Sequence, residues 1–196
     1  KSDVIALQET HGTIHNFRME LGPVLSRFHV FADEQRVNGG VALLVKKDLV
    51  RAEYVRAEVL VAGRVIRVCA EDVGVGFRVT CVHQFGLQEN VLKDVVEKVE
   101  CDVRWALDSP MCRSSWVVGD FNWGQAGFVR TFVDCPLLAL NESEKKKSKE
   151  RSLTKDQKIW KEALGEYTEI VTGLATHYDA KSTCFSCIDR IFVATP

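Results

Sequence analysis

Short apolar runs bounded by Gly, Asn or Asp recur along the chain, and this pattern predicts β-strands. The predicted strands cover residues 4–7, 41–45, 65–69, 77–82, 116–118 and 188–193. Several of these runs are apolar on both faces, so both faces have to be covered by other parts of the chain. We therefore expect packed sheets with helices outside them. The segment 72–76 contains two glycines and predicts a hairpin turn between two of the strands.

Helical periodicity is clear in further segments. Apolar residues recur at helical spacing over residues 91–106, between Glu, Lys and Asp, which predicts a helix that lines the core. A second helix is predicted to begin at Thr154, whose hydroxyl caps it while Gln157 reaches back, and to end at Gly165. A helix over residues 13–27 is interrupted by a Gly-Pro pair. This alternation of strands and helices is typical of a mixed α/β or α+β domain.

The composition is that of an ordinary globular domain. The chain has 196 residues, enough for one sizeable core, with 46% hydrophobic and 27% charged residues. This balance excludes disordered, collagenous and coiled-coil chains. Because 26 Lys and Arg stand against 27 Asp and Glu, the net charge of -1 makes no overall electrostatic case for a nucleic-acid partner.

A polar, basic segment at about 141–153 is predicted to be an insertion. Its basic residues are Lys145, Lys146, Lys147, Lys149 and Arg151. Such a composition fits a solvated or disordered loop and a phosphate-attracting arm equally well.

The cysteines and the apolar runs bear on the compartment. Seven cysteines are an odd number and no signal-peptide pattern precedes them, so we expect free thiols in a reducing compartment, the cytoplasm or the nucleus. No run approaches the roughly 18 apolar residues that a membrane-spanning helix needs. We therefore predict an intracellular protein without a transmembrane segment.

Polar side chains suited to metal binding or catalysis lie at the ends of the predicted strands. Glu9 follows the first strand, Asp120 and Asn122 follow the fifth, and Asp189 lies in the last. A carboxylate there is held rigidly, where a hard divalent cation can be shared with a substrate. Each carboxylate alone is more often a loop or helix cap. His83 ends a further strand, where its imidazole can donate a proton or a hydrogen bond to a phosphate oxygen.

Other common catalytic and metal-binding motifs are missing from the sequence. The five histidines show no zinc-ligand spacing, and Cys184 and Cys187 form a lone C-x-x-C without a second pair. There is no Gly-x-Ser-x-Gly, no Walker loop and no Gly-x-Gly-x-x-Gly after a strand. Serine hydrolysis, P-loop nucleotide hydrolysis and hydride transfer therefore lack their usual sequence support.

The polar residues belong to short phrases that occur in a specific order. The phrases are Leu7-Gln8-Glu9-Thr10, Gly39-Gly40-Val41-Ala42, Val82-His83, Gly119-Asp120-Phe121-Asn122 and Ile188-Asp189-Arg190. Together they resemble the endonuclease/exonuclease/phosphatase superfamily of DNase I-like proteins, over nearly the whole chain. The resemblance implies a single, partial α+β domain over residues 1–196. It also implies a four-layer sandwich, in which two packed mixed sheets are flanked by helices and the functional site lies at one rim.

The resemblance implies a role for each polar residue. Glu9 is similar to the metal-binding glutamate of the superfamily. Asp120 and Asn122 are similar to the pair that binds the metal and positions the attacking water and the scissile phosphate. His83 is similar to the strand-end catalytic histidine of the DNase I-like branch, and Asp189 to the aspartate that supports the catalytic histidine and phosphate region. The implied cofactor is Mg²⁺, with Mn²⁺ as its substitute.

Two further residues are candidate substrate contacts. Trp123, next to Asn122, is placed to stack on a base or ribose, although a tryptophan after a strand more often packs in the core. Arg190, next to Asp189, is the second candidate.

Two segments of the superfamily have no counterpart in the sequence. They are an Asn-bearing strand before Leu7 and a Ser-Asp-His segment beyond Asp189, which supplies the catalytic histidine. Cys187 also stands where the family commonly has Arg, which removes a phosphate contact. We therefore expect either a domain clipped at both ends or a degenerate copy, and the start at Lys1 favours clipping.

These observations lead to one functional expectation with two alternatives. The segment Thr176-His177-Tyr178 before the last strand is similar to retrotransposon-type endonucleases, which favours DNA as the partner. We expect a monomeric Mg²⁺-dependent phosphodiesterase, a DNA endonuclease in which water attacks a phosphodiester. The alternatives are a phosphatase or phosphodiesterase for inositol phosphates or lipid headgroups, and a degenerate non-catalytic domain of the same fold.

Overall fold

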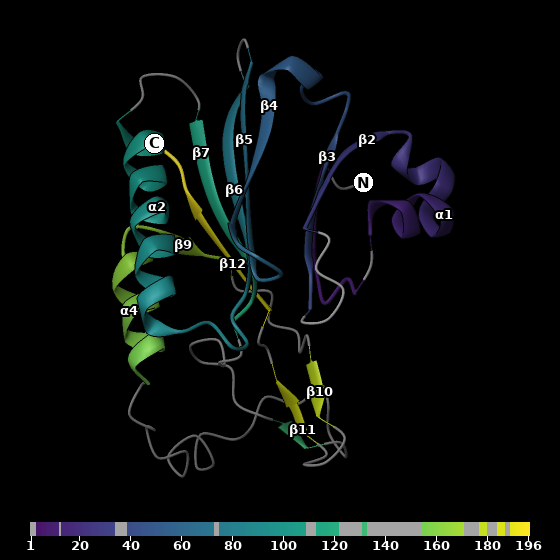
Figure 1. The fold of residues 1–196 in the computed structure, drawn as a ribbon. Helices are drawn as coiled ribbons and strands as arrows, with labels where there is room; N and C mark the ends of the chain where they lie inside the picture. Colours follow the sequence, from purple (N-terminus) through teal and green to yellow (C-terminus); the bar gives the residue numbers. More distant parts are fainter. Residues whose placement is uncertain are drawn as a thin grey trace.

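Two β-sheets pack face to face, with helices on their outer faces (Figure 1). The computed structural model describes residues 3–11, 13–33, 39–72, 75–108, 113–121, 131–132, 154–170, 177–179, 184–186 and 189–196. The layers are, in order, helix α1 (Ile14–Leu25), a three-stranded sheet, a six-stranded sheet, and the helices α2 (Glu89–Leu107) and α4 (Lys155–Ala163). The expected α+β four-layer sandwich is therefore confirmed.

The three-stranded sheet is antiparallel, in the order β1-β3-β2. Its strands are β1 (Val4–Gln8), β3 (Val41–Lys46) and β2 (Phe28–Ala32). Successive side chains of a strand point to opposite faces. Accordingly, Ile5 and Leu7 of β1 pack toward Leu25 of α1, whereas Val4 and Ala6 pack toward the other sheet. The predicted break in α1 is present, since its helical geometry is lost at the glycine before Pro23.

The six-stranded sheet has the order β4-β5-β6-β7-β12-β9. Its strands are β4 (Val55–Val61), β5 (Val65–Asp72), β6 (Val75–His83), β7 (Arg113–Asp120), β12 (Asp189–Ala194) and β9 (Thr168–Glu169). Only β6 and β7 pair in parallel among these strands. A parallel pair needs a crossover connection, and α2 lies in the one between β6 and β7.

The helices α2 and α4 bury the outer face of the six-stranded sheet. The apolar stripe of α2 includes Leu92, Val95 and Val99, and it packs in one cluster with Trp160 of α4 and Phe192 of β12. The start of α4 carries the predicted capping box, in which the Thr154 hydroxyl accepts from the Gln157 N–H and the Gln157 side chain accepts from the Thr154 N–H. No helix in the described part of the chain is both long and apolar enough to cross a membrane.

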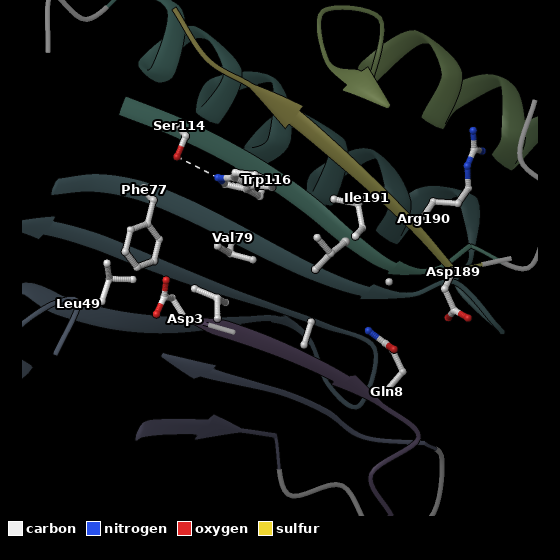
Figure 2. Close-up of a pocket in the computed structure, with 14 residues that line it drawn as sticks. Asp3, Gln8, Leu49, Phe77, Val79, Ser114, Trp116, Asp189, Arg190 and Ile191 are labelled. Carbon is white, nitrogen blue, oxygen red and sulfur yellow. Dashed lines mark hydrogen bonds between the residues drawn. The ribbon is translucent and has the colours of Figure 1, made fainter. Parts of the chain in front are cut away.

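The inner face of the six-stranded sheet is only partly covered, because the opposite sheet is narrower. Trp116 and Ile191, on β7 and β12, line an open apolar cleft of about 760 Å³ together with Val4 and Ala6 of β1 (Figure 2). One end of the cleft is lined by Gln8 and Asp189. The cleft therefore leads to the end of the sandwich where the candidate residues His83, Asp120 and Asp189 lie.

A small third sheet lies beside one end of the sandwich, in the lower part of Figure 1. It has the order β10-β11-β8 and comprises β10 (His177–Asp179), β11 (Cys184–Ser186) and β8 (Thr131–Phe132). A short 3₁₀ helix, Ala52–Tyr54, precedes β4.

The structure confirms each predicted strand within its described residues, the hairpin of β5 and β6, and the helices. The strands β2 and β4 were not predicted, nor were the two- and three-residue strands β8, β9, β10 and β11. β2 and β4 are edge strands. In β4 apolar and polar residues alternate from Val55 to Val59, so its sequence carried a strand pattern that was missed. The predicted insertion at 141–153 lies outside the described residues.

Candidate functional site

Four polar residues form a row across the six-stranded sheet, at the end where β6 and β7 terminate. Arg64 directly precedes β5, and its carbonyl accepts a hydrogen bond from the N–H of His83 at 2.8 Å. His83 pairs in turn with Asp120 of β7, and Asp120 pairs with Asp189 of β12. Neighbouring strands lie about 4.8 Å apart, so the row from Arg64 to Asp189 spans about 14 Å.

All four side chains of the row lie on the inner face of the sheet. The residues two positions away in each strand belong to the inner core or line the cleft: Ile66, Cys81, Val118 and Ile191. Because side chains alternate with a period of two, the members of the row share that face. The row is therefore turned toward the opposite sheet and not toward α2 and α4.

Glu9 reaches the row from the opposite sheet. It follows β1 with a φ of 51°, a left-handed conformation that non-glycine residues seldom adopt, and His11 has a φ of 42°. The Glu9 side chain is 65% exposed, and its Oε1 lies 3.6 Å from Nε2 of His83. Unusual backbone conformations of this kind cluster at functional sites. The loop thus presents an accessible carboxylate to the row.

Glycines allow this loop to lie close to the row. The N–H of His11 donates to the carbonyl of Gly39 at 2.8 Å, and Gly39 has a φ of 105°. A Cβ at Gly39 would lie 3.0 Å from Nδ1 of His83 and 3.1 Å from Nη1 of Arg64. The Gly39-Gly40 phrase found in the sequence therefore permits backbone to cover the Arg64–His83 pair.

The imidazole of His83 is almost completely buried, at 2% exposed. Burial, and next the positive charge of Arg64, lower the pKa of His83 below its ordinary value of 6.5, although Asp120 and Glu9 oppose the shift. His83 is therefore neutral at pH 7. Nη1 of Arg64 lies 2.8 Å from its Nδ1, and the Phe85 ring stacks at 6.3 Å between centroids.

The segment that carries Asp120 is anchored by buried contacts. Phe121 is fully buried and meets Trp160 and Phe192 edge to face, at 5.2 and 5.4 Å between centroids. The N–H of Gln84 donates to the carbonyl of Asp120 at 2.8 Å, while Oε1 of Gln84 accepts from the indole of Trp160 at 2.6 Å. Helix α4 thus helps to position Asp120 through Trp160.

Arg190 lies on the outer face of the six-stranded sheet. It is two residues before Phe192, whose side chain packs with α2 and α4, so the two side chains share that face. Its guanidinium, 4% exposed, makes two contacts of 2.7 Å with the Glu169 carboxylate. This buried ion pair holds the guanidinium on the outer face of the sheet, and a contact between Arg190 and a substrate stays a prediction. Asn122, Trp123, Cys187 and Ile188 lie outside the described residues.

The carboxylates of the site suit a hard divalent cation. Glu9 is exposed, and both Glu9 and Asp120 lie close enough to His83 to affect its pKa. Mg²⁺ takes one or two carboxylates and keeps several waters, so these two groups fit its preferences. Within the described part of the chain, no three His, Cys, Asp or Glu side chains cluster around one point. A closed cage made only of such side chains is therefore not formed by the described residues.

Arg64 is the site residue that sequence analysis missed. A signal for it existed, because residues equally distant from a hairpin turn face each other across the two strands. Asp72 pairs with Val75 and Val65 with Val82, so the next pair outward is Arg64 and His83. Extending the predicted hairpin would therefore have placed a guanidinium beside the candidate histidine.

Comparisons with known proteins identify the fold. No protein-family model matches the sequence, and no curated protein matches it. Among solved structures, a 3'-5' exonuclease (NExo) from Neisseria meningitidis has a TM-score of 0.59 at 18% identity, covering 98% of this chain and 76% of its own. An AP endonuclease from Archaeoglobus fulgidus has a TM-score of 0.58 at 16% identity, covering 98% and 76%.

A third solved structure has a different described activity. ANGEL2, a 2',3'-cyclic phosphatase, has a TM-score of 0.52 at 15% identity, covering 98% of this chain and 69% of its own. The similar structures all belong to the endonuclease/exonuclease/phosphatase superfamily. The chain therefore has the DNase I-like fold of that superfamily, and the resemblance carried by its sequence phrases is confirmed at the level of the fold.

Proposed function

We propose that this protein is a divalent-metal-dependent phosphodiesterase that cuts DNA as an endonuclease. The observation that carries the proposal is the row of Arg64, His83, Asp120 and Asp189, which faces the exposed carboxylate of Glu9 at one rim of the sandwich. Hydrolysis of a phosphodiester needs an oriented water and compensation of charge on the phosphoryl oxygens. The row combines carboxylates with hydrogen-bond donors suited to both tasks.

Glu9 and Asp120 are the residues that would hold Mg²⁺, or Mn²⁺ in its place, together with Asn122. When bound, such an ion supplies charge neutralisation at the phosphoryl oxygens and at the leaving oxygen. Both carboxylates are attached to the ends of paired strands, which limits their movement. The site would therefore be largely formed before substrate arrives.

The other steps are assigned to side chains of the row. In this proposal Asp120 accepts a hydrogen bond from the attacking water and directs it toward phosphorus. The neutral imidazole of His83 donates a hydrogen bond to a phosphoryl oxygen, which is stabilising where that oxygen gains charge. Asp189, whose backbone pairs with that of Asp120, contributes a second carboxylate that positions the water and the phosphate region.

DNA is favoured as the substrate by similar structures that act on it. These include the AP endonuclease and a 3' phosphatase NExo variant solved with a product DNA hairpin, at a TM-score of 0.57 and 17% identity. A chain with a net charge of -1 needs a local basic region to bind a polyanion. The lysines between residues 145 and 149 are the candidates for that region.

Small phosphate esters or lipid headgroups are the second candidate substrates. The similar structures include ANGEL2, a 2',3'-cyclic phosphatase, and a mannosyl-6-phosphatase from Bacteroides thetaiotaomicron with a TM-score of 0.53 at 15% identity. A net charge near zero also suits a small anion better than a long polyanion. Phosphate release from a panel of inositol phosphates, sugar phosphates and headgroup esters separates this candidate from the first.

The deciding experiment is nicking of supercoiled plasmid in Mg²⁺ at low salt, where phosphate contacts are least screened. We expect nicking that EDTA abolishes and that Asp120→Asn lowers by about 100-fold or more. Asp94→Asn, the same change at an exposed position of α2, is the matched control and should nick like the wild type. A folded chain extended at both ends into the two missing segments that nicks in neither Mg²⁺ nor Mn²⁺ would exclude the endonuclease. Inactivity on the small substrates as well would favour a non-catalytic domain.

A further inference from the structure

The guanidinium of Arg64 lies against the ring of His83. Its Nη1 is 2.8 Å from Nδ1 and 3.5 Å from Nε2 of the imidazole, so Nδ1 is the bonded nitrogen. A guanidinium has five N–H donors and no acceptor, and it stays charged in proteins. In a hydrogen bond between these atoms Nδ1 must therefore accept, which leaves the proton of the neutral ring on Nε2.

The guanidinium is confined in this position by several neighbours. The Arg64 carbonyl accepts the His83 N–H at 2.8 Å, which locks the two backbones together. The guanidinium carbon lies 5.6 Å from the centroid of the Phe85 ring, within cation–π range. Gly39 leaves room for it, since a Cβ there would lie 3.1 Å from Nη1. These contacts hold the guanidinium in place, so the Arg64–His83 hydrogen bond is a fixed part of the site.

We propose that Arg64 is a positioning residue that holds His83 in the tautomer protonated on Nε2, so that His83 acts in the site only as a hydrogen-bond donor. The nitrogen that carries the proton is the one that faces the Glu9 carboxylate, at 3.6 Å. A carboxylate or an anionic phosphoryl oxygen accepts from such an N–H. The lone pair of Nδ1 is occupied by Arg64, so His83 does not take the proton of the attacking water.

The inference deepens the proposed function, because the catalytic meaning of the tautomer rests on phosphoryl-oxygen binding at this rim. It also gives two neighbouring residues of the row, Asp120 and His83, different roles in hydrogen bonding. Asp120 can accept a proton or a hydrogen bond and His83 can only donate one. The tautomer itself is a property of the chain, and it can be measured without metal or substrate.

The test is nuclear magnetic resonance of the protein labelled with ¹⁵N in its histidines, near neutral pH and without metal. Long-range ¹H–¹⁵N correlations distinguish a protonated from an unprotonated ring nitrogen, and His83→Asn assigns the signals. The wild type is expected to show His83 as a single tautomer with Nε2 protonated. A wild-type ring with Nδ1 protonated would overturn the proposal.

Substitutions of Arg64 test whether this residue sets the tautomer. Arg64→Met removes the donors and should yield a mixture of tautomers, whereas Arg64→Lys keeps a cationic donor and should shift the mixture back. Arg56→Met removes the same charge from an exposed site at the opposite end of the β4–β5 hairpin, and should leave the His83 signals unchanged. If Arg64→Met is folded and keeps the wild-type tautomer, Arg64 has only a packing role and the proposal is wrong.

Activity provides a separate readout. On the substrate that the nicking and phosphate-release assays identify, Arg64→Met is expected to lower kcat by about 10-fold or more with a smaller change in KM. Arg64→Lys should recover part of that loss in step with the tautomer. If no substrate is cleaved but Arg64→Met redistributes the tautomers, the proposed function fails and the role of Arg64 stands. If Arg64→Met lowers cleavage and leaves the tautomers unchanged, the proposed function stands and the role of Arg64 in setting the tautomer fails.

Discussion

Asp120 and Asp189 lie directly opposite each other on the antiparallel strands β7 and β12, both on the face of the sheet that is turned toward Glu9. Carboxylate oxygens are the ligands that a hard divalent cation such as Mg²⁺ prefers. A site with two adjacent carboxylates, and a third across the gap, is therefore expected to gain stability from a bound cation.

Mg²⁺ should raise the thermal midpoint of the wild type relative to a salt control of equal ionic strength. A ligand at about 100 times its Kd stabilises the folded state by about 2.7 kcal/mol. Glu9→Gln and Asp120→Asn should remove most of this shift, and Glu97→Gln, at an exposed position of α2, should retain it. Equal midpoints with and without Mg²⁺ in the wild type would argue against a metal at this rim. Differential scanning fluorimetry is sufficient for the measurement.

Gly119→Ala is expected to destabilise the fold severely. Gly119 has a φ of 143°, and a Cβ there would overlap the carbonyl oxygen of Val82 on the neighbouring strand. The backbone would have to move, at a cost of about 3 kcal/mol or more. Gly86→Ala, where φ is also positive but the nearest contact is 3.7 Å away, should cost only about 1 kcal/mol. Urea unfolding compares the two, and equal losses would contradict the overlap with Val82.

Asp102→Asn should also lower the free energy of unfolding. Asp102, 1% exposed, accepts from Nε of Arg67 at 2.7 Å and from Nη1 of Arg78 at 2.8 Å, between α2 and the sheet. The hydrogen bond to Asp102 raises the pKa of Arg67 above its ordinary value. Removing the carboxylate leaves two largely buried guanidinium groups without it, which should cost about 3 kcal/mol.

The matched control for Asp102 is Asp94→Asn, an exposed position on the same helix, which should change stability by no more than about 0.5 kcal/mol. Denaturant unfolding measures both variants. A loss at Asp102 no greater than that at Asp94 would show that the ion cluster contributes little.

The stability of the fold should fall at alkaline pH. Burial raises the pKa of Cys81 from its ordinary 9.0 to about 12, and burial also raises the pKa of Tyr167 above its ordinary 10.0. Both groups are neutral in the folded chain at pH values where the unfolded chain has already lost their protons. Their contribution is therefore complete below pH 9.0 and is lost as the pH rises from there toward the folded pKa values.

Urea unfolding as a function of pH checks this sign. Tyr167→Phe should make the decline above pH 10.0 shallower, although it also removes hydrogen bonds to the Val99 carbonyl at 3.2 Å and to Ser115 at 2.7 Å. A free energy of unfolding that is constant or rises above pH 9.0 would contradict the burial of these two groups.

Local patterns in the sequence were sufficient for much of the fold. The alternation in β5 and β6 and the turn between them predict a hairpin, and the Thr154–Gln157 pair predicts the start of α4, because these structures depend on residues close in sequence. The short phrases around Glu9, His83, Asp120 and Asp189 likewise led to the correct fold. Edge strand β4 was not predicted, although its apolar and polar residues alternate from Val55 to Val59.

Pairing between distant segments decided which of these residues meet. The register of β12 on β7 places Asp189 beside Asp120 and turns Arg190 to the other face, where Glu169 binds it. A shift of one residue would exchange those two side chains, and no local pattern specifies the shift, since it depends on how both strands pack in the core. The chemistry of each side chain is thus readable from the sequence, whereas the partner of each is a consequence of strand register.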